Sequence, residues 1–232
     1  MIKDLHFPEQ CTGQLLDKYL RHGWYRLGQI IFTTDFIPHA ESWYRVFWLR
    51  YNLSVISYSK KQLAVLKLNQ HFTVRIKPLK ITKEIEDLYQ RYKSHIDFEI
   101  SPTLKNYLYD GSTFDAPKQN VFHTEMIEVR NNNKLIAAGI YDNGEDSIAG
   151  IINFYHPDYA RFSLGKFLML SKINHAIATN KTWYYPGYIA YLYTKFDYKL
   201  FPSREASEIY DPETQNWLPY SEALMAELAG RQ

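Results

Sequence analysis

The stretch that decides the fold runs from residue 147 to 188 and reads SIAGIINFYHPDYARFSLGKFLMLSKINHAIATNKTWYYPGY. Its ends, Ser147 to Tyr155 and Thr182 to Tyr188, are rich in β-branched and aromatic residues, which predicts two strands. Between them, Ser163 precedes an apolar segment that reaches about Ala178, which predicts a capped helix. The expected order is therefore strand, helix, strand.

Two further strands are predicted upstream of this stretch, over Val121 to Val129 and Lys134 to Tyr141. The separators Asn131-Asn-Asn133 and Asp142-Asn-Gly-Glu145 have the composition of hairpin turns. A strand meander, a helix and another strand is the order of the Gcn5-related N-acetyltransferase fold, although many other α+β proteins share it. In that fold an acyl donor binds where two neighbouring strands splay apart. We therefore expect an α+β protein with a C-terminal domain of this kind.

The N-terminal part is predicted to be a smaller β-rich unit that follows a short helix. The helix covers Gln14 to His22 and ends at Gly23. Strands are expected at Trp24 to Thr33, Trp43 to Arg50, Leu53 to Tyr58 and Phe72 to Lys77, with a turn at Tyr51-Asn52. Helices are expected at residues 82–94, with Thr82 as cap, and around Pro102 to Tyr109. The expected division is a β-rich subdomain 1–80, a transferase-like domain 81–205 and a tail 206–232 with a short helix.

Composition excludes several classes of protein. The chain has 232 residues, a globular composition and a formal net charge of +2, so it is not a generally basic nucleic-acid binder. Its single cysteine, Cys11, allows no internal disulfide and fits a reducing compartment. Neither an export signal nor a membrane span is indicated, and the histidines lack zinc-site spacing. We expect a cytoplasmic protein without a metal.

Positive charge is concentrated in one segment that contains no Asp or Glu between its ends. Its members are Arg45, Arg50, Lys60, Lys61, Lys67, Arg75, Lys77, Lys80 and Lys83. Such a segment fits either a solvated protein face or contact with a phosphate backbone. Abundant tyrosine favours nucleic acid, because aromatic rings stack on unpaired bases.

A run of tyrosines and lysines from Trp183 to Lys199 is the strongest candidate for a functional site. Gly187 lies within a predicted strand, which indicates a bulge or the close approach of a ligand. Lys195 and Lys199 flank Tyr198 at a spacing of four, and ammonium groups beside phenols suit an anionic ligand. Core packing of the tyrosines and a surface turn for the lysines are the alternatives.

The turn Arg161-Phe-Ser-Leu-Gly-Lys166, at the start of the predicted helix, is the second candidate. Backbone N–H groups at a helix N-terminus bind phosphate groups, and glycine permits close approach. Only Gly165 is present, so the full glycine pattern of acetyl-CoA enzymes is missing. A capped helix with a packing glycine is the alternative.

These residues resemble the arginyl-tRNA–protein transferases and the bacterial leucyl-tRNA–protein transferases. Gly187-Tyr188 and Lys195-Phe-Asp-Tyr198-Lys199 match the family's C-terminal pattern at the same spacing. Phe154 to Tyr159, with His156 where an aspartate is usual, and Ser163-Leu-Gly165 match the preceding segments.

The resemblance extends to the N-terminal half. Gly23-Trp-Tyr-Arg-Leu-Gly28 is similar to a glycine-bounded family segment, and Arg50, Ser59-Lys-Lys-Gln62 and Lys67-Leu-Asn69 follow in register. Between Phe32 and Arg50, where the family has a cysteine cluster, this chain has no cysteine. A metal or iron–sulfur role therefore does not carry over.

The resemblance implies transfer of arginine or leucine from aminoacyl-tRNA, with no other cofactor, to proteins that begin with an acidic residue. The alternatives are an acetyl-CoA-dependent acetyltransferase and a catalytically degenerate relative that binds acidic N-termini or RNA. The implied catalytic residues are Tyr188, Lys195 and Tyr198. The implied substrate-binding residues are Arg26, Tyr155, Asp158, Ser163, Leu164, Gly165, Lys166, Tyr185, Gly187 and Lys199. The implied tRNA-binding residues are Arg50, Lys60, Lys61 and Lys67.

Overall fold

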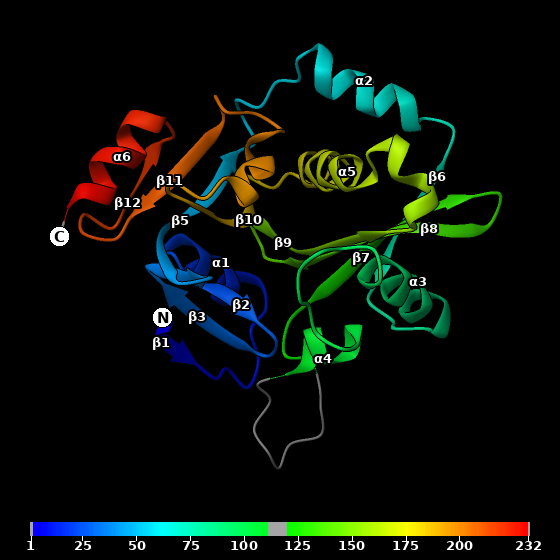
Figure 1. The fold of residues 1–232 in the computed structure, drawn as a ribbon, viewed down its shortest axis with the longest axis horizontal. Helices are drawn as coiled ribbons and strands as arrows, with labels where there is room; N and C mark the ends of the chain where they lie inside the picture. Colours follow the sequence, from blue (N-terminus) through cyan, green and yellow to red (C-terminus); the bar gives the residue numbers. More distant parts are fainter. Residues whose placement is uncertain (1, 111–119, 232) are drawn as a thin grey trace.

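Two β-sheets organise the chain, and helices cover both faces of the larger one (Figure 1). The computed structural model describes residues 2–110 and 120–231. The small sheet has the order β1-β3-β2, from Ile2–His6, Ile30–Thr34 and Tyr25–Leu27, and helix α1 (Gly13–Arg21) lies beside it.

The large sheet has nine strands and contains the meander expected from the sequence. Along the sheet these are β12 (Asn216–Pro219), β11 (Ser207–Asp211), β5 (Ser42–Asn52), β10 (Trp183–Ala190), β9 (Ser147–Tyr155), β8 (Lys134–Asn143), β7 (Thr124–Asn131) and β6 (Thr73–Pro78), and β4 (Phe36–His39) pairs with β5. Strands β9 and β10 are parallel, whereas the other neighbours are antiparallel. A parallel pair needs a crossover connection, and helix α5 (Leu164–Ala178) provides it.

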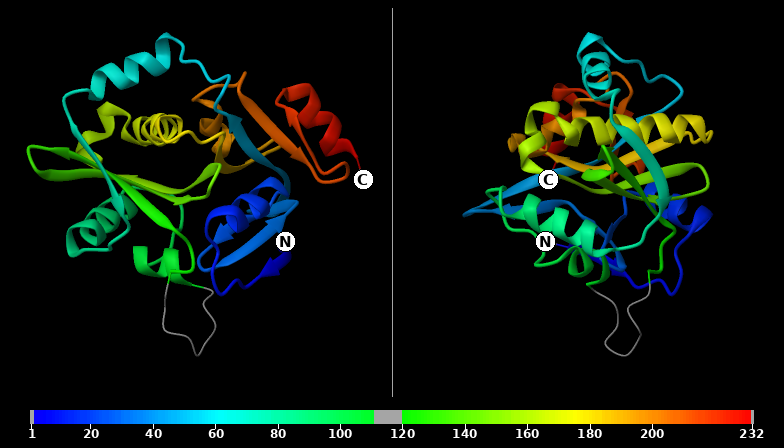
Figure 2. Two further views of the ribbon diagram at one scale, coloured as in Figure 1. Left: turned by 180° about the vertical axis from the view of Figure 1, so that it is seen from behind. Right: turned by 90° about the vertical axis from the view of Figure 1, so that its right-hand side faces the viewer.

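Helices form a layer on each side of this sheet. Helices α5 and α2 (Lys60–Asn69) cover one face, whereas α3 (Lys83–Lys93), α4 (Leu104–Tyr109) and the N-terminal unit cover the other (Figure 2). The remaining helices are α6 (Glu222–Gly230) and the 3₁₀ segments η1 (Pro157–Phe162) and η2 (Thr194–Leu200). Separate apolar clusters fill the space under α5, under α3 with α4, and under the N-terminal unit.

The α+β prediction is confirmed, as are the strands near residues 43–50 and 72–77, the meander, and the helices at 14–22, 82–94 and 102–109. The predicted strand from Leu53 to Tyr58 is wrong. Strand β5 continues through the expected turn at Tyr51-Asn52, because Tyr51 is fully buried in the sheet. The chain then leaves the sheet where the Asn52 side chain accepts hydrogen bonds from Ser54.

The predicted strand from Trp24 to Thr33 is two strands joined by a turn at Gly28. Gly28 has φ +59°, and a Cβ there would lie 1.9 Å from the backbone oxygen of Asp110. Only glycine fits such a position without rearrangement. Strands β5 and β6, from the predicted unit 1–80, and β11, from the predicted tail, are members of the large sheet. The three-part division of the chain stays a prediction.

Candidate active site

The candidate site lies where strands β9 and β10 part. They pair only over three positions, the last being Tyr185 with Ala149. Beyond this point the pairing of β10 with β5 shifts in register between Tyr184 and Gly187, and Gly187 has φ +98°. A bulge of this kind bends its strand, so β10 turns away from β9.

A tyrosine from the N-terminal unit stands where the strands begin to part. The Tyr25 hydroxyl lies 2.6 Å from the carbonyl oxygen of Gly150 on β9 and 2.9 Å from that of Tyr185 on β10. The next carbonyl on β9, that of Ile151, accepts a hydrogen bond from the hydroxyl of Tyr107 at 3.3 Å. Side chains thus satisfy carbonyl groups that a neighbouring strand would otherwise bind.

A buried lysine meets the same strand from the opposite face. Lys172 of α5 donates to the carbonyl of Ile140 at 2.7 Å and lies 3.5 Å from that of Ile152. Gly139 makes room for it, because a Cβ there would lie 2.9 Å from the lysine Cε. Burial lowers the pKa of Lys172 to about 7, despite the opposing effect of Asp142.

The phenols around the parting are protonated at neutral pH. Burial raises the pKa of Tyr107 and Tyr198 to about 12 and raises the pKa of Tyr188. Nearby phenols add to the effect, including Tyr92 beside Tyr198. Tyr198 as a whole residue is nevertheless 52% exposed, so a ligand can reach it. These side chains can donate protons or hydrogen bonds to a ligand.

Lys199 provides an amine next to Tyr188. Its Nζ donates to the Tyr188 carbonyl at 2.7 Å and lies 4.9 Å and 4.8 Å from the ring centres of Tyr188 and Phe196. Burial lowers its pKa to about 7. A Cβ at Gly187 would lie 3.2 Å from this nitrogen, so the glycine leaves room for the amine.

Other predicted residues of the Tyr-Lys run are more exposed. Lys195 is an exposed residue whose Nζ lies 4.2 Å from the ring centre of Phe98, in the connection between α3 and α4. Through this contact η2 touches the connection between α3 and α4. Lys195 and Tyr198 are therefore accessible to a large substrate.

The start of α5 is a second part of the candidate site. Ser163 occupies the cap position with φ +52°, and its side chain makes no capping hydrogen bond, contrary to the expected cap. Leu164 is buried, and a Cβ at Gly165 would lie 3.5 Å from the ring of Tyr155. Lys166 is exposed, with its Nζ 4.8 Å from the Phe201 ring centre. The backbone N–H groups in the first turn of an α-helix have no hydrogen-bond partner within the helix, so they can bind an anion.

Asp158 and Tyr155 flank this helix start. The Asp158 side chain is 78% exposed, 3.7 Å from Nδ1 of His156. The ring of Tyr155 lies 5.3 Å from that of Tyr92 on α3. Tyr155 therefore connects the helix start to the group of phenols at the parting.

Three predicted ligand-binding residues are occupied by contacts within the protein. Arg26 is buried and binds Asp142 at 2.7 Å, as well as backbone carbonyls. Arg50 lies between the rings of Trp183 and Trp217, at 3.6 Å and 4.5 Å, and pairs with Glu208. The Tyr185 side chain is buried against Trp217. These side chains build the fold around the site.

The three predicted tRNA-binding lysines lie on helix α2. Lys60, Lys61 and Lys67 are exposed, and α2 packs on α5 and η1. The helix begins with a capping box formed by Ser59 and Gln62. A cationic helix therefore lies beside the element that starts at Ser163.

Sequence reasoning missed Tyr25, Tyr92 and Tyr107 as residues of the site. Tyr25 is inside the glycine-bounded segment, whose resemblance could have drawn attention to it. Tyr92 and Tyr107 come from helices whose apolar spacing indicates only core packing. Only the fold brings these phenols to the strand parting.

Comparison with known proteins identifies the class of transferase. A family model described as "Arginine-tRNA-protein transferase, C terminus" matches residues 84–204, and the chain belongs to this family. A Campylobacter jejuni protein named aspartate/glutamate leucyltransferase is 26% identical over 202 residues, which are 83% of this chain and 79% of that protein. A protein of the same name from Leptospira interrogans is 25% identical over 203 residues, 84% of this chain and 74% of its own length.

Two solved structures show more distant similarity. L-PGS from Bacillus licheniformis aligns with a TM-score of 0.46 and 11% identity over 66% of this chain and 50% of its own. FemX aligns with a TM-score of 0.46 and 8% identity over 78% of this chain and 61% of its own. Within residues 2–110 and 120–231, no group of three or more His, Cys, Asp or Glu side chains is arranged to hold a metal ion. No helix in those ranges has the length and apolar character needed to cross a membrane.

Proposed function

We propose that this chain transfers an amino acid from charged tRNA to the α-amino group of a protein that begins with Asp or Glu. Family membership supports the reaction class, and the names of the relatives support leucine as the amino acid and acidic residues as the acceptors. A tRNA co-substrate and the absence of a further cofactor are parts of this proposal, as is a cytoplasmic location.

The observation that carries the proposal is the hydrogen bond from the Lys199 amine to the backbone carbonyl of Tyr188, beside the strand parting. The reaction is aminolysis of an ester: the acceptor nitrogen forms a bond to the carbonyl carbon, and the bond from that carbon to the ribose oxygen breaks. The nitrogen loses a proton, and the ribose oxygen gains one. A group with a pKa near 7 can accept the first proton, and a protonated phenol can supply the second.

The residues at the parting suit these two tasks. The Lys199 amine, with its pKa of about 7, is the proposed proton acceptor for the attacking amine. Tyr188 or Tyr198, each with a raised pKa, is the proposed proton donor to the leaving oxygen. Lys195 is exposed beside them and is assigned to the end of the tRNA or to the acidic side chain of the acceptor.

The tRNA is assigned to the surface formed by the start of α5 and by helix α2. In this assignment, tRNA phosphates bind the backbone N–H groups of the first turn after Ser163 and the ammonium group of Lys166. Lys60, Lys61 and Lys67 extend the positive charge along α2. Phosphate contacts position a nucleic acid without reading its sequence.

The test uses purified protein, tRNA charged with labelled leucine or arginine, and peptides that begin with Asp, Glu or Ala. We expect label on the Asp and Glu peptides only. Lys199→Met, and one of the two variants Tyr188→Phe and Tyr198→Phe, should lower the rate by about 100-fold or more, the usual effect of removing a general acid or base. Tyr58→Phe, which alters a tyrosine bonded to Asn174 elsewhere, is the matched control. Incorporation into no peptide with either amino acid would refute the proposal.

A further inference from the structure

A separate cavity of about 260 Å³ lies in the N-terminal part of the protein, between the small sheet and strands β5 and β11. It is smaller than the roughly 300–1,000 Å³ of sites for drug-sized ligands. A cavity of this size suits a single side chain, whereas a nucleotide or a folded peptide does not fit in it.

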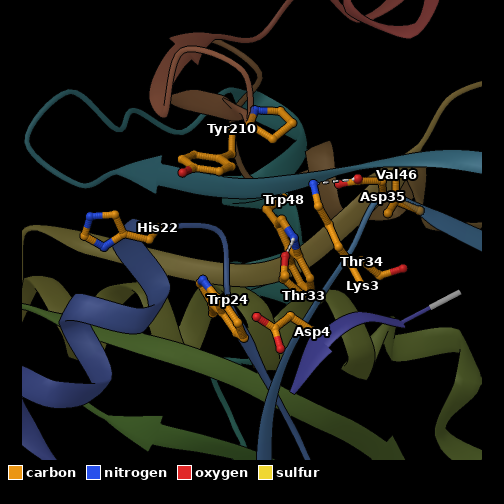
Figure 3. Close-up of a pocket in the computed structure, with 11 residues that line it drawn as sticks. Lys3, Asp4, His22, Trp24, Thr33, Thr34, Asp35, Val46, Trp48 and Tyr210 are labelled. Atoms are coloured by element: carbon orange, nitrogen blue, oxygen red, sulfur yellow. Dashed lines mark hydrogen bonds and ion pairs between the residues drawn. The ribbon is translucent and has the colours of Figure 1, made fainter. Parts of the chain in front are cut away.

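Three aromatic rings form one side of the cavity. Figure 3 shows Trp24, Trp48 and Tyr210 along this side, with the ion pair of Lys3 and Asp35 across from them. Trp48 and Tyr210 are buried, and Trp24 is half-buried. The three rings line the cavity, and aromatic rings attract cations that come within about 6 Å of them.

The rings are fixed by their surroundings. Trp48 stacks on Tyr25 at 5.4 Å with an interplanar angle of 18°. Gly23 has φ +73°, and a Cβ there would lie 2.6 Å from the Tyr210 ring and 3.2 Å from Trp48. Because Gly23 lacks a side chain, both rings approach the backbone directly. The aromatic side of the cavity is therefore built into the fold.

The cavity carries more negative than positive charge. Lys3 pairs with Asp35 at 2.9 Å. Asp4 also lines the cavity, and its carboxylate accepts a hydrogen bond from the backbone of Leu5 but has no ion-pair partner among residues 2–110 and 120–231. His22 also lines the cavity, and its Nδ1 lies 2.7 Å from the carbonyl oxygen of Lys18. With this imidazole counted as neutral, the two carboxylates and one ammonium leave a net charge of −1, which favours a cation and repels phosphate.

We propose that this cavity binds the guanidinium group of an arginine side chain on a peptide or protein. A guanidinium is planar, stacks on aromatic faces and donates two parallel hydrogen bonds to a carboxylate, here that of Asp4. A lysine ammonium is a compact, strongly hydrated charge and matches flat rings less well. The inference does not depend on the transferase function, because it concerns residues outside the strand parting.

The test measures binding of the peptide Ala-Arg-Ala, acetylated and amidated at its ends, by calorimetry and tryptophan fluorescence. The blocked N-terminus prevents the peptide from acting as an acceptor, so the result is separate from transfer activity. Replacing arginine by its uncharged isostere citrulline should weaken binding about tenfold or more, the loss expected for one charge-assisted pair. A lysine peptide should bind more weakly than the arginine peptide.

Two variants of cavity residues test where the peptide binds, because they should change its dissociation constant in opposite directions. Asp4→Asn should raise the dissociation constant about fivefold or more, whereas Lys3→Met should lower it about threefold, because the Asp35 carboxylate becomes free for the ligand. Glu41→Gln, which removes an exposed acid on the turn between β4 and β5, should leave it unchanged. Thermal unfolding of each variant checks that it is folded.

Several outcomes would overturn the proposal. These are no binding of the arginine peptide at millimolar concentration, equal binding of the citrulline or lysine peptide, or an Asp4→Asn variant that binds as Glu41→Gln does. Weaker binding by Lys3→Met would also contradict it, since this lysine is expected to compete with the ligand.

Discussion

Arg26 shows how a residue can match a family motif and still serve the fold. Its side chain and that of Asp142 are at most 1% exposed, and they pair at 2.7 Å. Thr124 and the carbonyls of Gly28 and Leu108 complete its hydrogen bonds. The resemblance implied contact with substrate, but the structure uses this guanidinium to join the N-terminal unit to strand β8.

Replacing Arg26 by methionine is expected to destabilise the protein by about 3–5 kcal/mol, because the Asp142 carboxylate would be left buried without its cation. Urea unfolding at pH 7 measures the change. Lys83→Met breaks the exposed pair between Lys83 and Asp87 and should cost less than about 0.5 kcal/mol. Equal losses for the two variants would contradict this account of the buried pair.

Lys172 should make stability depend on pH. Its pKa is about 7 in the folded protein and 10.5 in an ordinary lysine, so between these values the unfolded state binds more protons. The stability of the wild type relative to Lys172→Met should therefore rise above pH 7, by about 1.4 kcal/mol per pH unit, and fall as the pH returns to 7.

Urea unfolding at pH 7, 8 and 9 measures this difference. Lys18→Met, which changes an exposed lysine of α1, serves as the control. Parallel pH profiles of the wild type and Lys172→Met would show that the buried amine does not titrate in this range.

At the scale of elements, most helices and strands could be predicted from the spacing of apolar residues. In α1, α3 and β8 the residues with this spacing are the buried ones. Helix α2 was missed, although Ser59 and Gln62 form a capping box that the sequence displays. Its apolar residues do not form one buried stripe, since Leu63 and Leu68 are exposed, and the apolar spacing therefore indicates no helix. Tyr188 and Tyr198 were predicted from the sequence, but Tyr25, Tyr92 and Tyr107 were not, because only long-range packing brings β2, α3 and α4 to the strand parting.

Helix α2 should make binding of charged tRNA depend on salt. Replacing Lys60, Lys61 and Lys67 together by glutamine should weaken binding and flatten the plot of log K against log salt by about two to three units, roughly 0.7–0.9 for each lost phosphate contact. The control changes three exposed cationic residues outside the basic segment, Lys18, Arg21 and Lys105, to glutamine. The same slope for both triple variants would place the tRNA away from α2.

At the scale of the whole molecule, residues 206–232, predicted as a tail with a short helix, supply strands β11 and β12 of the large sheet. Strand β11 pairs with β5 in the large sheet, and Glu208 on it holds Arg50. Ile209 and Tyr210 on this strand are buried. A segment described only as a tail with a short helix therefore contributes to the sheet that contains the candidate site.

A chain that ends at Pro202 should lose cooperative folding, because strand β5 would become an edge with its buried residues uncovered. Circular dichroism during heating and size-exclusion chromatography measure this. A chain that ends at Tyr220 keeps β11 and β12 and should still unfold in one transition. Cooperative unfolding of the shorter chain would show that the sheet is stable without β11.

The position of Tyr25 has a consequence for how such a protein can change in evolution. Its hydroxyl, from the first thirty residues, meets backbone carbonyls of Gly150 and Tyr185. These partners are backbone carbonyl groups, which every residue has. Their positions are therefore set by the paths of strands β9 and β10 and not by the side chains of Gly150 and Tyr185. Recombination that exchanges either half of the chain with that of a relative would have to preserve this fit, and the halves are therefore expected to be inherited as one unit.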